Sequence, residues 1–326
     1  MKKLLKKILL VVLALVVIAL LYVFLEPLTE KISSGPADDS ESWMARLGDD
    51  VLISDISIPG ANDSATQYVQ LAFFSKCQSL SVGEQLRDGC RYLDIRLGLN
   101  KSGDDLIFYH GFCKCKTGFL PWERDLEIGD VLERCYVFLK EHPTETIVFA
   151  VKMERGDDTA AFQTVLQRYI ELDPGMWYLS DSIPRLGECR GKLVLMRRYE
   201  DALSLGSASG IQLFWTDQGG NSDTSLNAAR EPQDTYVLSV QDRFKYSAAD
   251  KWSAFKAAFG AGNGEDLRIN FLSTNGTPKF GHPFTYAKIL NKNLLSENIS
   301  GLPKSWIILD FVNAELAEHV YDINFR

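Results

Sequence analysis

Eight short apolar runs, separated by longer stretches of helical periodicity, constrain the fold of this 326-residue chain more than any other feature. Several runs are hydrophobic almost throughout, as expected of strands buried on both faces of a parallel sheet. The stretches between them, such as 128–141 and 159–170, repeat apolar residues at helical spacing. Strands alternating with helices predict an α/β fold, an irregular (β/α)8 TIM barrel. The predicted strands are 51–57, 91–97, 106–109, 146–152, 192–197, 236–240, 267–272 and 306–311.

Polar and titratable residues follow these runs with regularity. In a barrel, the carboxyl ends of all strands meet at one mouth, where enzymes of this fold place their active sites. The sequence therefore predicts one shared site. Its members, in chain order, are Asn62, Asp63, Asp94, Arg96, His110, Lys152, Arg197, Arg198, Gln241, Asp242 and Asp310.

Three of these segments form recognisable motifs. The first reads Ile-Pro-Gly-Ala-Asn-Asp-Ser from Ile58, the second Arg-Tyr-Leu-Asp-Ile-Arg from Arg91, and the third Tyr-His-Gly from Tyr109. With them the chain resembles the X domain of the phosphatidylinositol-specific phospholipase C family, in its bacterial single-domain form. The resemblance implies a phosphodiesterase barrel that acts on phosphatidylinositol or related head-group phosphodiesters. It is densest over residues 51–154.

Cleavage of such a diester needs a base for the attacking inositol hydroxyl, an acid for the leaving oxygen and positive charge on the phosphoryl oxygens. By resemblance, His110 is the general acid. Arg96 stays protonated and can hold two phosphate oxygens at once. The resemblance implies that Arg96 takes the place of the calcium ion used by metal-dependent relatives. We therefore expect acid–base catalysis without a metal or another cofactor.

The resemblance also assigns supporting residues around these two. Asp63 matches the Asp of the first motif, Asp310 matches a carboxylate that supports the base, and Asp94 orients Arg96 or a site His. Substrate contacts are implied for Lys152, Arg198, Asp242 and Phe244, where the family often has Tyr in place of Phe244. Whether Arg197 or Arg198 faces the site stays open.

Asn62 stands where the family has its general-base His. An amide does not take up a proton near neutral pH, and loss of a general base costs roughly 10²–10⁴ in rate. Three interpretations follow: Asp63 or Asp310 replaces the base, the chain is a pseudoenzyme that binds an inositol-phosphate or phospholipid head group, or it cleaves a different diester. A metal-dependent glycerophosphodiesterase is disfavoured, because it needs paired carboxylates where the chain has Asp94 and Arg96.

The N-terminus is a separate unit. Residues 8–25 are apolar without interruption, which is long enough to span a bilayer. The four lysines within residues 2–7 predict that the N-terminus stays in the cytoplasm. Because no small-residue cleavage site follows, we expect an uncleaved transmembrane signal anchor over 1–25, a linker over 26–42 and the barrel over 43–326. The protein would be a single-pass protein of the cell membrane with an extracytoplasmic catalytic domain.

The remaining composition narrows the partners. The net charge of −8, despite the N-terminal lysines, leaves an acidic body and argues against a nucleic-acid partner. Outside the cell, the six cysteines predict one or two disulfides beside buried thiols. Phe73, Phe74 and residues 119–122 are candidates for contact with a bilayer, although packing in the core is the favoured interpretation.

Overall fold

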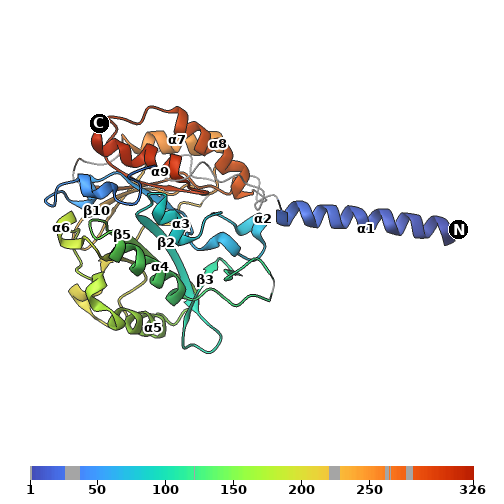
Figure 1. Ribbon diagram of the computed structural model, residues 1–326, viewed down its shortest axis with the longest axis horizontal. Helices are drawn as coiled ribbons and strands as arrows, with labels where there is room; N and C mark the ends of the chain where they lie inside the picture. The colour runs from blue at the N-terminus through green and yellow to red at the C-terminus, as the bar shows by residue number, and fades with distance from the viewer. Residues whose placement is uncertain are drawn as a thin grey trace.

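A curled sheet with helices on its outer surface forms the body of the protein (Figure 1). The computed structural model describes residues 2–25, 37–120, 122–219, 228–260, 264, 266–276 and 282–326, without the side chains of 21–25. The strands are β1 (Ile58–Ala61), β2 (Tyr92–Leu99), β3 (Leu106–His110), β4 (Cys113–Lys114), β5 (Ile147–Arg155), β6 (Trp177–Tyr178), β7 (Leu193–Arg198), β8 (Ile211–Gln212), β9 (Ala229–Pro232), β10 (Val237–Gln241), β11 (Leu267–Phe271) and β12 (Trp306–Leu309). The α-helices are α1 (Lys2–Leu25), α2 (Ala72–Ser75), α3 (Val82–Arg87), α4 (Ile128–Glu141), α5 (Thr159–Leu172), α6 (Leu186–Cys189), α7 (Ala248–Ala258), α8 (Pro283–Ser296) and α9 (Ala314–Tyr321).

The parallel part of the sheet runs from β8 through β7, β5, β2, β1, β12 and β11 to β10. Over the residues that the structure describes, no backbone ladder joins β8 to β9 or β10, so the barrel is open there. Side chains cross the opening instead. Gln233 accepts a hydrogen bond from the Phe214 N–H (2.8 Å) and donates one to the Phe214 carbonyl (2.7 Å). The predicted α/β class is thus confirmed, as a curled barrel-like sheet rather than a closed one.

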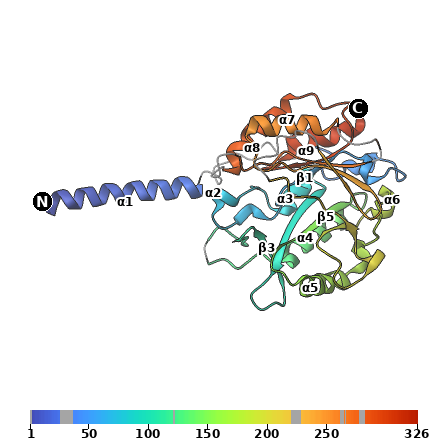
Figure 2. The ribbon, with the colours of Figure 1, turned by 180° about the vertical axis from the view of Figure 1, so that it is seen from behind.

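Residues along each strand alternate between the interior of the curl and its outer surface, as the pleat requires. Tyr92 and Trp306 lie in the interior cluster, whereas Leu93 and Ile95 pack in the outer cluster with residues of α3 and α4. Farther along the same outer surface, α7, α8 and α9 cover β11, β12 and β1 (Figures 1 and 2). Asp94 and Arg96 share the inward register of Tyr92, which directs both toward the mouth.

The segment before β1 fills the end of the curl opposite the mouth. Trp43 and Ile53 are buried in the same cluster as the interior strand residues. Arg91, at the foot of β2, pairs with Glu145 at 2.8 Å, and both side chains are fully buried. The Arg91 guanidinium also donates to the carbonyl of Ser40 at 3.0 Å, which holds the residues before Trp43 against the body. The division into anchor, linker and barrel stays a prediction.

Two of the strand predictions need correction, and the sequence analysis missed a strand. The run 51–57 is not a strand: Ile53–Asp55 form a 3₁₀ turn, and the first strand is β1, which carries the Pro-Gly motif itself. The run 106–109 is β3, an antiparallel hairpin partner of β2 rather than a barrel strand. The parallel strand β8 was not predicted, because two residues are too short to produce a pattern.

The N-terminal helix α1 extends away from the body (Figures 1 and 2). Within the described part of the chain, no helix has the length and apolar character needed to cross a membrane. The predicted transmembrane anchor is therefore not confirmed.

The prediction of disulfides is wrong for this structure, in which all six cysteines are free and buried. Each thiol packs as a small apolar group within the body, which is a common environment for cysteine. The six residues are Cys77, Cys90, Cys113, Cys115, Cys135 and Cys189.

Candidate active site

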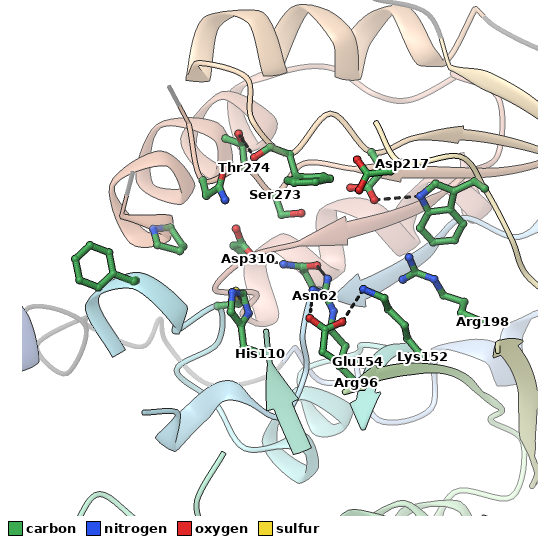
Figure 3. Close-up of a pocket in the computed structure, with 17 residues that line it drawn as sticks. Asn62, Arg96, His110, Lys152, Glu154, Arg198, Asp217, Ser273, Thr274 and Asp310 are labelled. Atoms are coloured by element: carbon green, nitrogen blue, oxygen red, sulfur yellow. Dashed lines mark hydrogen bonds and ion pairs between the residues drawn. The ribbon is translucent and has the colours of Figure 1, made fainter. Parts of the chain in front are cut away.

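A pocket of about 400 Å³ opens at the mouth of the curled sheet (Figure 3). It brings together eight of the twelve residues predicted for the site; Asp63 and Asp94 contact pocket residues from behind, and Arg197 and Gln241 do not line it. The lining residues are Asn62, Phe74, Cys77, Arg96, His110, Lys152, Glu154, Arg198, Trp215, Asp217, Asp242, Phe244, Ser273, Thr274, Asn275, Pro283 and Asp310.

His110, the last residue of β3, forms a short hydrogen bond through Nδ1 with the Asp63 carboxylate. Asp63 adopts a left-handed backbone (φ 47°), which Asp tolerates better than most residues. Burial lowers the pKa of His110, but the adjacent Asp63 outweighs it, so the His110 pKa lies above its usual value. The contact with Asp63 therefore favours the protonated ring, the form in which a His can act as a general acid.

Arg96 is held by carboxylates from three strands. Its Nε and Nη2 atoms lie 2.9 and 2.8 Å from Asp94, and its Nη1 atom lies 3.5 Å from Asp63 and 4.0 Å from Glu154. Burial lowers the Arg96 pKa, but the carboxylates outweigh it and raise that pKa well above its usual value. Conversely, burial raises the pKa of Asp94, and the arginines Arg96 and Arg198 bring it below its usual value. Arg96 is thus a fixed positive charge at the pocket wall.

Asn62 follows β1 and lies between Arg96 and Asp310. Its Nδ2 donates to Asp310 Oδ1 at 2.8 Å, and its Oδ1 accepts from Arg96 Nη2 at 3.2 Å. Gln78 donates to both the Asn62 carbonyl (2.9 Å) and the Leu309 carbonyl (2.8 Å), which ties the ends of β1 and β12 together. The amide plane of Asn62 is therefore fixed, with its nitrogen toward Asp310.

Opposite these groups, β5 and β7 supply cations. Lys152 Nζ lies 2.6 Å from Glu154. Arg198 rather than Arg197 faces the pocket: its guanidinium lies 3.5 Å from Asp94 and 3.7 Å from the ring centre of Trp215. Arg197 instead bonds Ser209 at 3.1 Å. The choice follows from the strand period, because Arg198 has the register of the interior residues.

The far wall carries Asp242 and Phe244. Trp215 Nε1 donates to Asp242 Oδ2 at 3.1 Å, and burial raises the pKa of Asp242 above its usual value. Phe244 lines the pocket with its ring, which suits packing against the face of a sugar.

Sequence reasoning missed several pocket residues. Glu154 has a signal in hindsight, because it lies two residues after Lys152 on β5 and so shares its face. It also accepts from the Gly111 N–H at 3.0 Å, beside the acid His110. Trp215, Asp217 and the segment 273–275 come from irregular loops, where no periodic pattern points to them.

One group of side chains among the described residues has ligand atoms close enough to share a metal ion. It consists of Asp63, Cys77 and His110, whose candidate atoms lie within 4.8 Å of one another. Asp63 already bonds His110 and faces Arg96, and that fixed positive charge repels a cation at this point. Burial raises the Cys77 pKa well above its usual value, so the thiol also lacks the charge that a metal ligand needs.

An apolar rim lies beside the mouth. Six of its large side chains are exposed, up to 70% for Phe112 and 76% for Trp122. Four of them, Leu71, Phe112, Phe119 and Leu120, line a groove of about 590 Å³ that shares α2 with the pocket wall. The interpretation of core packing is therefore wrong for Phe74 and for the described residues among 119–122; Pro121 lies outside the described part. The rim residues are Leu71, Phe74, Phe112, Phe119, Leu120 and Trp122.

The mouth of the curled sheet thus holds a His110–Asp63 pair beside Arg96, which neighbouring carboxylates hold in place. Residues 61–199 match the family model of the phosphatidylinositol-specific phospholipase C X domain. The chain is 27% identical over 305 residues to a 1-phosphatidylinositol phosphodiesterase of Staphylococcus aureus, covering 87% of this chain and 90% of that protein. It is also 27% identical over 338 residues to the enzyme of that name from Listeria monocytogenes, covering 96% of each.

Two solved structures share the fold. A phosphatidylinositol-specific phospholipase C from S. aureus superposes with a TM-score of 0.69 at 22% identity, covering 87% of this chain and 97% of that one. The L. monocytogenes enzyme gives 0.65 at 24% identity, covering 87% and 98%. The chain thus has sequence similarity to phosphatidylinositol-specific phospholipases C, with the X-domain model matched over residues 61–199, and shares their fold.

Proposed function

We propose that this protein cleaves phosphatidylinositol, or a closely related inositol phosphodiester, by phospholipase C-type transfer. The neighbouring inositol hydroxyl attacks phosphorus, a new P–O bond closes a cyclic phosphate, and the bond to the diacylglycerol oxygen breaks. His110 donates a proton to that leaving oxygen. Arg96 neutralises the negative charge that builds on the phosphoryl oxygens. The products are a cyclic inositol phosphate and diacylglycerol.

The observation that carries this proposal is the pairing, at one pocket wall, of a guanidinium held by carboxylates with a His bonded to one of those carboxylates. Arg96 is held in place by Asp63, Asp94 and Glu154, so it pays little ordering entropy when phosphate binds. His110 is held by Asp63, the same carboxylate that contacts Arg96. Acid and clamp are thereby positioned as one unit, Arg96 within β2 and His110 at the end of β3.

The alternative is a binding protein that holds an inositol-phosphate or phospholipid head group without cleaving it. Asn62 favours this alternative, because its amide stands where the resemblance predicts the general base. The pocket would then retain the clamp and the sugar contacts, and His110 would serve as a hydrogen-bond donor to phosphate.

The test is phosphodiesterase activity of the full chain, in detergent micelles with phosphatidylinositol, in the presence and absence of chelator. We expect release of cyclic inositol phosphate that chelator does not abolish and that H110A reduces roughly 10²–10⁴-fold. Saturable binding of phosphatidylinositol without any product, in wild type and H110A alike, would favour the binding protein.

We also propose that the protein works at a membrane surface. The sequence supports an anchor, because the apolar run continues from residue 20 to residue 25 without a charge. The apolar rim beside the mouth supports contact with the bilayer that holds the substrate. The proposed location is the cell membrane, with the catalytic body on the extracytoplasmic side.

Two measurements on cells that express the full chain test this location. We expect the protein to stay in the membrane fraction after carbonate extraction, and the body to be cleaved by protease added to intact spheroplasts. Release of the chain by carbonate would refute the anchor, and protection from protease would refute the orientation.

A further inference from the structure

The amide of Asn62 leaves the attacking hydroxyl without the base that the resemblance predicts, yet a carboxylate lies directly behind it. We propose that Asp310 is the general base of this protein and removes the proton from the attacking inositol hydroxyl beside Asn62. This inference rests on the proposed function. It makes Asn62 a positioning residue rather than a lost catalytic one.

The first support is the exposure of Asp310 to the pocket. Asp310 directly follows β12, and its side chain reaches the pocket wall between Asn62 and His110 (Figure 3). Only 3% of the residue is exposed, so it faces the pocket and not bulk solvent. Its Oδ1 accepts from Asn62 Nδ2 at 2.8 Å, and within the described part of the chain Oδ2 accepts no hydrogen bond. One carboxylate oxygen is therefore available to a hydroxyl of the substrate.

The second support is elimination among the neighbouring carboxylates. Asp63 bonds His110 and contacts Arg96, Asp94 contacts Arg96, and Glu154 lies 2.6 Å from Lys152. A carboxylate paired with a cation is a weak base, because the pair favours its ionised form. Asp310 has no such ion pair among the described residues.

Two carboxylates remain on the opposite wall, and their location disfavours both. Asp242 accepts a hydrogen bond from Trp215 at 3.1 Å, on the side of the pocket that holds Phe244. Asp217 is exposed, and its Oδ1 accepts from the Gly219 N–H at 2.6 Å. Asp310 is the candidate that adjoins both Asn62 and the phosphate clamp.

The electrostatic surroundings suit a base that works near neutral pH. Burial raises the pKa of Asp310 to about 7, and the nearby Asp63 adds to the effect. The opposing influences are the hydrogen bond from Asn62 and the positive charges of His110 and Arg96. Two further groups face Asp310: the buried Lys251 of α7, whose pKa burial lowers to about 7, and the neutral thiol of Cys77. A base with a pKa near the working pH combines an available lone pair with adequate strength.

The proton balance of the step is complete without another reagent. The Asp310 carboxylate takes the hydroxyl proton while the hydroxyl oxygen bonds to phosphorus, and the P–O bond to diacylglycerol breaks as His110 protonates the leaving oxygen. Asp310 ends the step protonated and His110 neutral, and exchange with water resets both. Asn62 keeps the carboxylate oriented through Nδ2 and contacts the clamp through Oδ1.

The experiment compares wild type, D310N, D310A and the control D55N, each as the full chain, by kcat/KM on micellar phosphatidylinositol between pH 5 and 9. We expect D310N to lose roughly 10²–10⁴ in kcat/KM, together with the acidic limb near pH 7 that wild type shows. Added formate, a small carboxylate, should restore part of the activity of D310A but not of D310N, which leaves it no space. D55N removes an exposed carboxylate of the Ile53–Asp55 turn, outside the pocket, and should stay close to wild type.

The outcomes separate this inference from the function on which it rests. Wild-type activity with D310N within threefold of it, and with the acidic limb unchanged, overturns the role of Asp310 while the proposed function stands. Absence of product from wild type overturns both. Loss of activity in D310N and D310A without any rescue by formate overturns a base role and leaves Asp310 as a structural group, and thermal melts verify that both variants are folded.

Discussion

The burial of Asp310 makes a prediction about stability that is independent of activity. Its pKa in the folded protein is about 7, against an ordinary value of 3.8. Between these two values the folded protein binds a proton that the unfolded chain releases, so ionisation of Asp310 opposes folding increasingly as the pH rises. Well below pH 3.8, Asp310 is protonated in both the folded and the unfolded state, so its ionisation does not affect stability. Well above pH 7 it is ionised in both states, and its destabilising effect has reached its full value.

The magnitude follows from the width of this window. Each unit of pKa difference corresponds to about 1.4 kcal/mol. The free energy of unfolding should therefore be lowered by about 2 kcal/mol at pH 5 and by about 4 kcal/mol at pH 8. Replacing Asp310 with Asn removes the charge but keeps an oxygen that can accept from Asn62. D310N should be more stable than wild type by these amounts, although we expect it to lose most of its activity.

Urea denaturation of both proteins at pH 5, 6, 7 and 8 measures the difference directly. The expected gain in D310N rises steadily from pH 5 and levels off above pH 7. H110A serves as a control, since it removes one positive neighbour of Asp310 and should make its ionisation more costly. A difference between D310N and wild type that is constant across this range would refute the reasoning, as would a D310N protein that is less stable at pH 8.

Three further predictions concern the clamp, the buried ion pair and the rim. R96K keeps the charge but not the forked contact with Asp94, so kcat should fall roughly 10²–10³-fold; a loss confined to KM would contradict a transition-state role. R91M leaves Glu145 buried without its partner and should lower the free energy of unfolding, measured by urea denaturation, by about 3–5 kcal/mol. The double variant R91M/E145L should recover much of that loss. Equal losses in the two variants would show that the unpaired charge of Glu145 is not the cause. W122S should reduce activity on phosphatidylinositol vesicles several-fold, with little change on micelles of a short-chain analogue. The control L172S, at an 80% exposed position on α5, should change neither, and equal effects of the two would refute a contact with the bilayer.

The sequence predicts the central strands well, because strands buried on both faces show as continuous apolar runs. β5 and β7 lie within or close to the predicted ranges 146–152 and 192–197. The run 51–57 fails for a physical reason: Ile53 is apolar because it fills the end of the curl, not because it lies in a strand. An apolar run indicates that a segment is buried, and burial alone does not distinguish a strand from an irregular segment that fills the end of the curl.

The first strand, β1, escapes recognition because its sequence looks like a turn. Pro59 and Gly60 are typical of turns and rare within strands. In the structure, a Cβ on Gly60 would lie 2.5 Å from Ile308 Cδ1 and 2.9 Å from Tyr92 Cβ. Glycine is required there because the neighbouring strands approach closely, and that requirement depends on tertiary contacts that no local pattern encodes.

The site residues likewise fall into those that the sequence predicts and those that it does not. Residues at the ends of parallel strands, such as Arg198 and Asp310, are predictable because topology brings all carboxyl ends of a parallel barrel to one mouth. Loop residues such as Trp215 are not, since their placement depends on long-range contacts. The sequence also named Phe74 and residues 119–122 as candidates for bilayer contact but favoured core packing, because an aromatic residue in a loop has the same sequence pattern whether it is buried or exposed.

The contacts of Asn62 bear on whether the departure from the family pattern is a loss or a redesign. A neutral loss of the base would leave the surrounding groups free to drift, because nothing would depend on their geometry. In this structure the amide is instead bonded at both ends, to Asp310 at 2.8 Å and to Arg96 at 3.2 Å, and its backbone is held by Gln78. An Asn in this network provides the donor that a deprotonated Asp310 needs, and its side chain is shorter than that of His, which opens a path from the carboxylate to the pocket. The carboxylate that the resemblance places in support of the base is therefore the group best placed to act as one.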